Sequence, residues 1–221
     1  MSNHKLYREA HPIPFVLTHW INLLAMCFLA LSGFYIHYPL FGGFMGLARG
    51  THFFWMFVLL INLIVRIVMA FFVKSAVMPN TREQDVDIKN WLPQAANKHQ
   101  FLPWIKYYLF LKKEAPISGK YGVLQKIAYL ATPIITLAAA YTGFCLWIPT
   151  STWPIFHAGT VAVANMFHAG GGGDPMPIRI LHFYIMWVII IFTAFHAYLA
   201  NIYNFSPSAM IFAWKESEGS H

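Results

Sequence analysis

The stretch that decides the fold is residues 179–203, RILHFYIMWVIIIFTAFHAYLANIY, which is apolar over the length of a membrane span and carries two histidines. A histidine inside a lipid-facing segment costs free energy and usually serves a function. His182 and His196 are fourteen positions apart, so on an α-helix they point within roughly 40° of each other and lie about 21 Å apart along the axis. One helix face therefore offers two imidazoles, one near each side of a hydrocarbon core about 30 Å thick.

The composition of the whole chain indicates an integral membrane protein. Of its 221 residues, 58% are hydrophobic and only 10% are charged, whereas soluble domains average about 25% charged residues. Cys27 and Cys145 lie in different apolar segments, which excludes a CxxC pair and an iron–sulfur ligand set, so histidine must hold any metal. The net charge of +7 is explained by membrane topology, and no nucleic acid is expected as a partner.

Four apolar segments are long enough to cross a bilayer. The first lacks a small-residue cleavage site and is expected to be a retained span rather than a signal peptide. We therefore predict an all-α integral membrane protein, a four-transmembrane-helix bundle in which residues 1–221 form a single domain. The spans are expected at about 15–37, 51–73, 123–148 and 179–203.

The distribution of Lys and Arg predicts the orientation of these spans. Most of the fifteen basic residues lie in the loop 74–122 or close to it, and the N-terminal tail holds two more. By the positive-inside rule, this loop and both termini are expected on the cytoplasmic side of a bacterial or archaeal inner membrane, and the loop 149–178 outside. Residues 91–113 are amphipathic and interfacial in composition, and residues 153–169 are expected to form a short helix on the outer surface.

This topology sorts four histidines into two pairs at two depths. His52 and His182 each lie near the start of an inward-running span and so near the outer face, whereas His19 and His196 lie near the inner face. Two such pairs are the ligand set for two b-type haems, each held between two helices. Zinc or copper would need three or four clustered ligands. For any one histidine, the alternative is a hydrogen bond between helices.

The remaining histidines are expected to have other roles. His37 shares a face with His19, but lies about 27 Å from it along the axis, beyond the outer pair, which favours an interfacial role. His157 and His168 in the outer loop are expected to contact a partner or to be ordinary surface residues. The others are expected to be solvated: His4, His11, His99 and His221.

Two further residues fall on the same fourteen-residue spacing. Gly33 follows His19 at the outer depth, where a missing side chain would let a porphyrin edge approach, although a helix-packing glycine is an equal alternative. Arg66 follows His52 at the inner depth, where a cation could neutralise a haem propionate or extend to the cytoplasmic interface. The strings SGF at 32–34 and TGF at 142–144 occupy equivalent positions, which suggests a weak repeat of the two hairpins.

Several motifs together resemble a known family. They are THW at 18–20, RGTHFFWMF at 49–57, YYLFLKK at 107–113, GGGGDPMPIRILHFYIMW at 170–187 and AFHAY at 194–198. In these motifs the chain resembles the cytochrome b subunits of membrane-bound nickel–iron hydrogenases, within a group that includes formate dehydrogenase gamma subunits and bacterial cytochromes b561. SGKYGVLQK at 118–126 is more similar to the gamma subunits, and Arg179 stands where hydrogenase-type relatives often carry a further histidine.

The resemblance implies an electron-transfer subunit with two haem b groups. Such a subunit anchors an iron–sulfur small subunit and a catalytic large subunit on the outer face, and passes their electrons to menaquinone near the cytoplasmic side. Asn22, Tyr198 and Asn201 lie at about the depth of a quinone site, although such residues more often join helices by hydrogen bonds.

Alternatives remain open from the sequence alone. They are the gamma subunit of a formate dehydrogenase or thiosulfate reductase type complex, a stand-alone quinone-linked cytochrome b561, and a haem-free membrane anchor or proton-coupled transporter.

Overall fold

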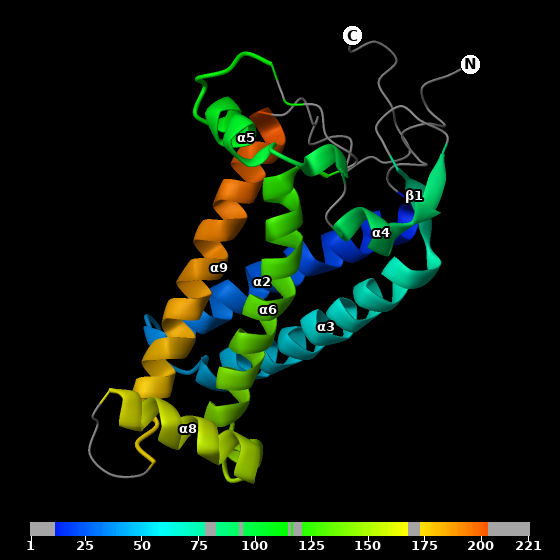
Figure 1. Cartoon of the computed structure of the whole chain (residues 1–221). Helices are drawn as coiled ribbons and strands as arrows, with labels where there is room; N and C mark the ends of the chain where they lie inside the picture. The colour runs from blue at the N-terminus through cyan, green and yellow to red at the C-terminus, as the bar shows by residue number, and fades with distance from the viewer. Residues whose placement is uncertain are drawn as a thin grey trace. The chain divides into compact units, whose positions relative to one another are not determined.

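Four long apolar helices dominate the structure, a computed structural model that describes residues 12–77, 83–92, 95–114, 116, 121–167 and 173–202. Within these residues, four helices have the length and composition needed to cross a membrane. They are α2 (Ile13–His37), α3 (Met45–Phe72), α6 (Val123–Leu146) and α9 (Met176–Ile202), shown in Figure 1. The predicted all-α membrane fold is confirmed. The chain divides into two compact units, residues 1–131 with 198–221, and residues 132–197.

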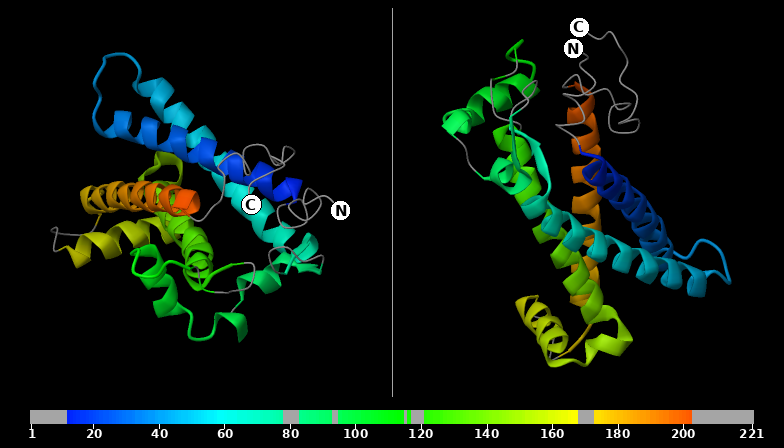
Figure 2. Two further views of the ribbon diagram at one scale, coloured as in Figure 1. Left: turned by 90° about the horizontal axis from the view of Figure 1, so that it is seen from above. Right: turned by 90° about the vertical axis from the view of Figure 1, so that its right-hand side faces the viewer.

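The first unit is built on a hairpin of α2 and α3, which pack along each other (Figure 2). Proline in the first turn of α2 suits a position whose backbone N–H has no helical partner. Gly43 adopts a φ of +86° in the connection between the helices, a conformation that glycine reaches without strain. α3 begins at Met45 rather than near residue 51, because each glycine inside a helix costs only about 1 kcal/mol and does not stop it.

A small polar substructure follows α3. Strands β1 (Lys74–Ala76) and β2 (Gln84–Val86) pair antiparallel, with Ser75 opposite Asp85. The sequence did not predict this hairpin, because its strands are short and carry few β-branched or aromatic residues. The short helix α4 (Asp87–Trp91) follows it, then the 3-10 helix η1 (Ala95–Asn97) and helix α5 (Phe101–Tyr108).

The second unit contains most of α6 and α9 with the loop between them. α6 continues through Pro133 and is followed by α7 (Ile148–Ser151) and α8 (Pro154–Met166). α8 lies across the adjoining ends of α6 and α9 (Figure 1). It is held to α6 by the Tyr141 hydroxyl, which donates to the Ile155 carbonyl at 2.8 Å. The helix predicted in this loop is confirmed, with bounds 154–166.

Candidate haem-binding site

In the first unit, the imidazole of His52 on α3 is held by a hydroxyl on α2. Ser32 Oγ lies 3.0 Å from His52 Nδ1. The same Oγ lies 2.6 Å from the Phe28 carbonyl oxygen, one turn back along its own helix. Ser32 is buried and His52 is half-buried. The contact therefore joins the two helices of the hairpin inside the apolar region.

The second unit repeats this arrangement with different residues. Thr142 Oγ1 on α6 lies 2.8 Å from His182 Nδ1 on α9, and 2.9 Å from the Ala138 carbonyl oxygen one turn back. Gly143 follows Thr142, and a Cβ at that position would lie 3.4 Å from His182 Cε1. The absent side chain thus leaves room for the imidazole beside α6.

These contacts indicate which ring nitrogen carries the proton. A serine or threonine hydroxyl has one proton, and the helical carbonyl that each hydroxyl faces can only accept a hydrogen bond. We therefore assign the hydroxyl proton to that carbonyl, so the hydroxyl oxygen accepts a bond from Nδ1–H. In this tautomer the Nε2 atom has the lone pair that can ligate a metal.

The two hydroxyls are functional candidates that sequence reasoning did not single out. Ser32 and Thr142 are the first residues of the equivalent SGF and TGF strings. The repeated strings do not indicate, however, which residue on another helix each hydroxyl contacts. Gly33, the glycine of the first string, is half-buried on α2 next to Ser32, in the place that Gly143 holds beside Thr142. Its predicted role beside a porphyrin stays a prediction.

The two histidines predicted to lie near the inner face also belong to different units. His19 on α2 is half-buried, and its ring makes an edge contact with Trp20, with centroids 6.0 Å apart. His196 on α9 is exposed within its unit and stacks on Phe192 with centroids 6.3 Å apart. The pairings of His19 with His196 and of His52 with His182 therefore stay predictions.

Arg66 is engaged by a buried acid rather than extended into water. Its Nη2 atom lies 2.8 Å from Asp87 Oδ2, and the side chains are 17% and 0% exposed. The guanidinium carbon lies 3.9 Å from the ring centroid of Phe15 and 5.0 Å from that of Trp91. Asp87 also accepts hydrogen bonds from Ser75 Oγ at 2.8 Å and from Trp91 Nε1 at 2.9 Å. This network fixes the orientation of the guanidinium.

The other terminal nitrogen of Arg66, Nη1, is buried and has no hydrogen-bond partner among the described residues. Phe15, which lies beneath the guanidinium, is one helical turn before His19. Asn62, one turn before Arg66 on α3, donates to the Thr18 carbonyl at 2.8 Å. Arg66 thus lies about one helical turn from the level of His19 within the α2–α3 hairpin, with an unsatisfied donor that suits an acidic group.

Comparison with known proteins shows the family of the chain. Residues 10–213 match the family described as prokaryotic cytochrome b561. The chain belongs to that family. It is also 26% identical over 200 residues to the probable Ni/Fe-hydrogenase 1 B-type cytochrome subunit of Escherichia coli K12, a match that covers 85% of this chain and 79% of that protein. The protein of the same name from Escherichia coli O157:H7 matches equally well. The family resemblance is confirmed, and the chain is a b-type cytochrome membrane subunit.

The residues present fit the haem b that a b-type cytochrome carries. His52 and His182 are oriented through Nδ1, as histidines that bind metals usually are. The buried Nη1 of Arg66 fits a propionate of the haem. Among the described residues, no three His, Cys, Asp or Glu side chains gather in the way that a zinc site requires.

The three residues predicted to contact quinone differ in their surroundings. Asn22 Oδ1 accepts a hydrogen bond from Asn62 Nδ2 at 2.7 Å, which is the helix-to-helix role that the sequence left open. Tyr198 on α9 is 52% exposed. Asn201 belongs to the last turn of α9, and its side chain is outside the described part of the structure.

Of the other histidines, some lie within the described residues and the rest lie outside them. Three are exposed, namely His37 at the end of α2, His99 in the turn before α5 and His157 on α8. The rest are outside the described residues: His4, His11, His168 and His221.

Proposed function

We propose that this cytochrome is the dihaem anchor subunit of a respiratory dehydrogenase of the nickel–iron hydrogenase type, and that it passes electrons from an outer iron–sulfur subunit to menaquinone. The proposed axial ligands are His52 with His182 for the outer haem, and His19 with His196 for the inner haem. The observation that carries the proposal is the matching hydroxyl contact to an imidazole in two separate hairpins, at Ser32 and at Thr142.

Within this proposal, each part of the site has a distinct task. Ser32 and Thr142 keep the proton on Nδ1 and thereby present Nε2 to the iron. Arg66 would hold a propionate of the inner haem through Nη1, and Asp87 keeps the guanidinium in place for that contact. A haem b held by these histidines would supply reversible one-electron transfer.

The proposed partners follow from the relatives and from topology. The E. coli relatives are named as subunits of a Ni/Fe-hydrogenase, which supports an iron–sulfur small subunit and a catalytic large subunit as partners on the outer face. The basic loop between α3 and α6 supports cytoplasmic termini and an inner-membrane location. Menaquinone would then be reduced near His19 and His196, where Asn22, Tyr198 and Asn201 remain candidate contacts.

A gamma subunit of a formate dehydrogenase or thiosulfate reductase type complex is the second candidate. Arg179 favours it, because this residue occupies the position where hydrogenase-type relatives often have a histidine. Arg179 is exposed in the first turns of α9. Co-purification of the chain with its native partners, followed by assay of hydrogen against formate as the electron donor to the haems, distinguishes the two complexes.

Haem quantification and spectra of histidine variants test the ligand assignment. The unmodified chain is expected to hold two b haems. His52→Ala and His182→Ala should each remove the same haem, and His19→Ala and His196→Ala should each remove the other. His157→Ala, which changes an exposed histidine on α8, serves as the matched control and should keep both haems. Loss of the same haem in His52→Ala and in His196→Ala would contradict the pairing.

A further inference from the structure

The candidate surface for a further function is the segment that ends α5. Leu109, Phe110 and Leu111 follow the helix, and their side chains are 61%, 69% and 74% exposed. Three consecutive apolar side chains that the described protein leaves uncovered mark a contact surface. Lys112 and Lys113, also exposed, come directly after them. The segment therefore joins an apolar end to a basic end.

The packing of α5 sets its depth relative to the bilayer. Trp104 on α5 is 1% exposed, and a Cβ at Gly122 would lie 2.9 Å from its indole ring. Gly122 immediately precedes Val123, the first residue of the membrane-spanning helix α6. One turn into α6, Lys126 Nζ donates back to the Leu92 carbonyl at 2.7 Å. The start of a span lies at the lipid headgroups, so α5 lies at that level too.

The backbone at Phe110 is the second unusual feature. Leu111 N–H donates to the Lys106 carbonyl at 2.8 Å and closes the helix, the bond pattern of a helix end that normally has glycine at the left-handed position. Phe110 occupies that position with a φ of +60°. A bulky residue there is strained and persists where the side chain is needed. In this backbone conformation the Phe110 ring is uncovered by the protein at the headgroup level.

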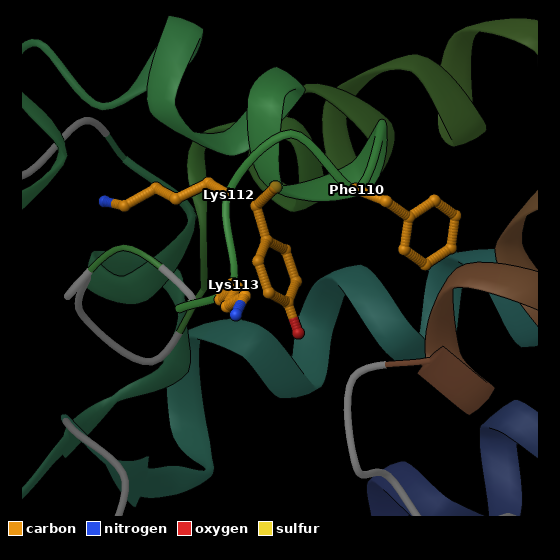
Figure 3. Close-up of a pocket in the computed structure, with 4 residues that line it drawn as sticks. Phe110, Lys112 and Lys113 are labelled. Carbon is orange, nitrogen blue, oxygen red and sulfur yellow. The ribbon is translucent and has the colours of Figure 1, made fainter.

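The charge around this segment is strongly basic. Residues 95–114 contain four lysines, all exposed, and one acid, Glu114. Lys112 and Lys113 line a cavity of about 250 Å³ together with Tyr107 and Phe110. Figure 3 shows the Lys112 and Phe110 side chains projecting in opposite directions from the segment. Ammonium groups beside an apolar anchor are complementary to a phosphate attached to acyl chains.

We propose that residues 109–113 form a binding site for anionic phospholipid in the leaflet where α6 begins. Leu109, Phe110 and Leu111 insert among the acyl chains, and Lys112 and Lys113 hold the headgroup phosphate. The site would fix α5, and through Trp104 the start of α6, against the membrane surface. This proposal needs only the membrane location of the chain and is independent of the haem pairing and of the partner.

Insertion is tested with a spin label on the haem-loaded full chain. Leu111→Cys is labelled in a Cys27→Ala, Cys145→Ala background and reconstituted in nanodiscs of phosphatidylcholine with or without phosphatidylglycerol. We expect the label at 111 to be more accessible to oxygen than to a water-soluble nickel reagent when phosphatidylglycerol is present. A label at Lys98→Cys in the same loop is the aqueous control. Equal access of the nickel reagent to both labels would overturn the proposal and favour a docked protein.

Headgroup selectivity is tested by thermal unfolding in detergent with added short-chain lipid. Phosphatidylglycerol should raise the midpoint for the unmodified chain, and phosphatidylcholine should not. Since each lysine near an anionic surface contributes about 1 kcal/mol, Lys112→Gln with Lys113→Gln should weaken the apparent affinity roughly thirtyfold. Lys89→Gln, at an exposed lysine in the same loop, should leave it unchanged. An equal rise with inorganic phosphate would identify a phosphate site and overturn the lipid assignment.

Phe110→Gly separates the backbone strain at residue 110 from the contribution of the aromatic ring to lipid binding. Glycine relieves the left-handed strain, so stability in detergent without lipid should be unchanged or higher. The same variant should lose part of the response to phosphatidylglycerol, because the aromatic anchor is gone. A response equal to that of the unmodified chain would contradict the role of Phe110 in insertion.

Discussion

Replacing Asp87 should destabilise the cytochrome far more than replacing Asp85, although both carboxylates form ion pairs with N–O distances of 2.8 Å. Asp87 is fully buried and accepts bonds from three side chains. Removing one partner of a buried pair costs roughly 3–5 kcal/mol, because the other charge stays buried without compensation. Arg66 is 17% exposed and can recover some hydration. We therefore expect Asp87→Ala to lower the free energy of unfolding by about 3 kcal/mol, the lower end of that range.

The control differs from Asp87 in burial rather than in geometry. Asp85 at the centre of β2 and Lys89 on α4 are 38% and 62% exposed, and the adjacent ammonium lowers the pKa of Asp85. Solvent screens such a pair, and most exposed pairs contribute little to stability. Asp85→Ala should therefore unfold at nearly the same temperature as the unmodified chain.

Thermal unfolding in detergent, followed by near-ultraviolet circular dichroism, measures both effects. A loss of about 3 kcal/mol corresponds to a midpoint lowered by roughly 6–12 °C in a chain of this size. Asp87→Leu combined with Arg66→Met should recover much of the loss, because no buried charge remains. Equal midpoints for Asp87→Ala and Asp85→Ala would refute the reasoning, as would a double variant less stable than Asp87→Ala.

Two further predictions concern the hydroxyl contacts and the attachment of α8. Ser32→Ala and Thr142→Val should each weaken retention of the proposed outer haem about 10–100-fold, measured as haem released to apomyoglobin. Thr193→Val is the matched control, because its hydroxyl bonds the Ile189 carbonyl at 2.8 Å one turn back, and equal release from all three variants would contradict the role of the contacts. Gly159→Ala should lower the unfolding midpoint, since the new Cβ would lie 2.8 Å from Tyr141 ring atoms. An unchanged midpoint would show that α8 moves aside at no cost.

The helices and the histidine positions could be predicted because both depend on local pattern. Apolar length identifies a span, and 3.6 residues per turn places His182 and His196 on one face whatever surrounds them. The start of α3 was placed too late, at residue 51 instead of Met45. There the prediction gave glycine more weight as a helix breaker than its cost of about 1 kcal/mol warrants.

The contacts of the site could not be predicted because they depend on how two helices align. The sequence placed Arg66 at the inner depth, but its acid partner, Asp87, comes from a short helix after an unpredicted strand pair. Ser32 and His52 meet only because α2 and α3 pack in one particular register. No periodicity within either helix encodes that register, and only the SGF and TGF strings hinted at it.

The shared hydroxyl contact makes the His52 and His182 imidazoles sensitive to the sliding of one helix along another. His52 is attached to α3, but the atom that orients its ring belongs to α2 and is itself tied to the α2 backbone. A small axial shift of α2 would therefore turn the ring about its Cβ–Cγ bond instead of merely stretching a contact. The same holds for His182 with α6. The orientation of each imidazole ring thus depends on the axial alignment of the two helices in its hairpin.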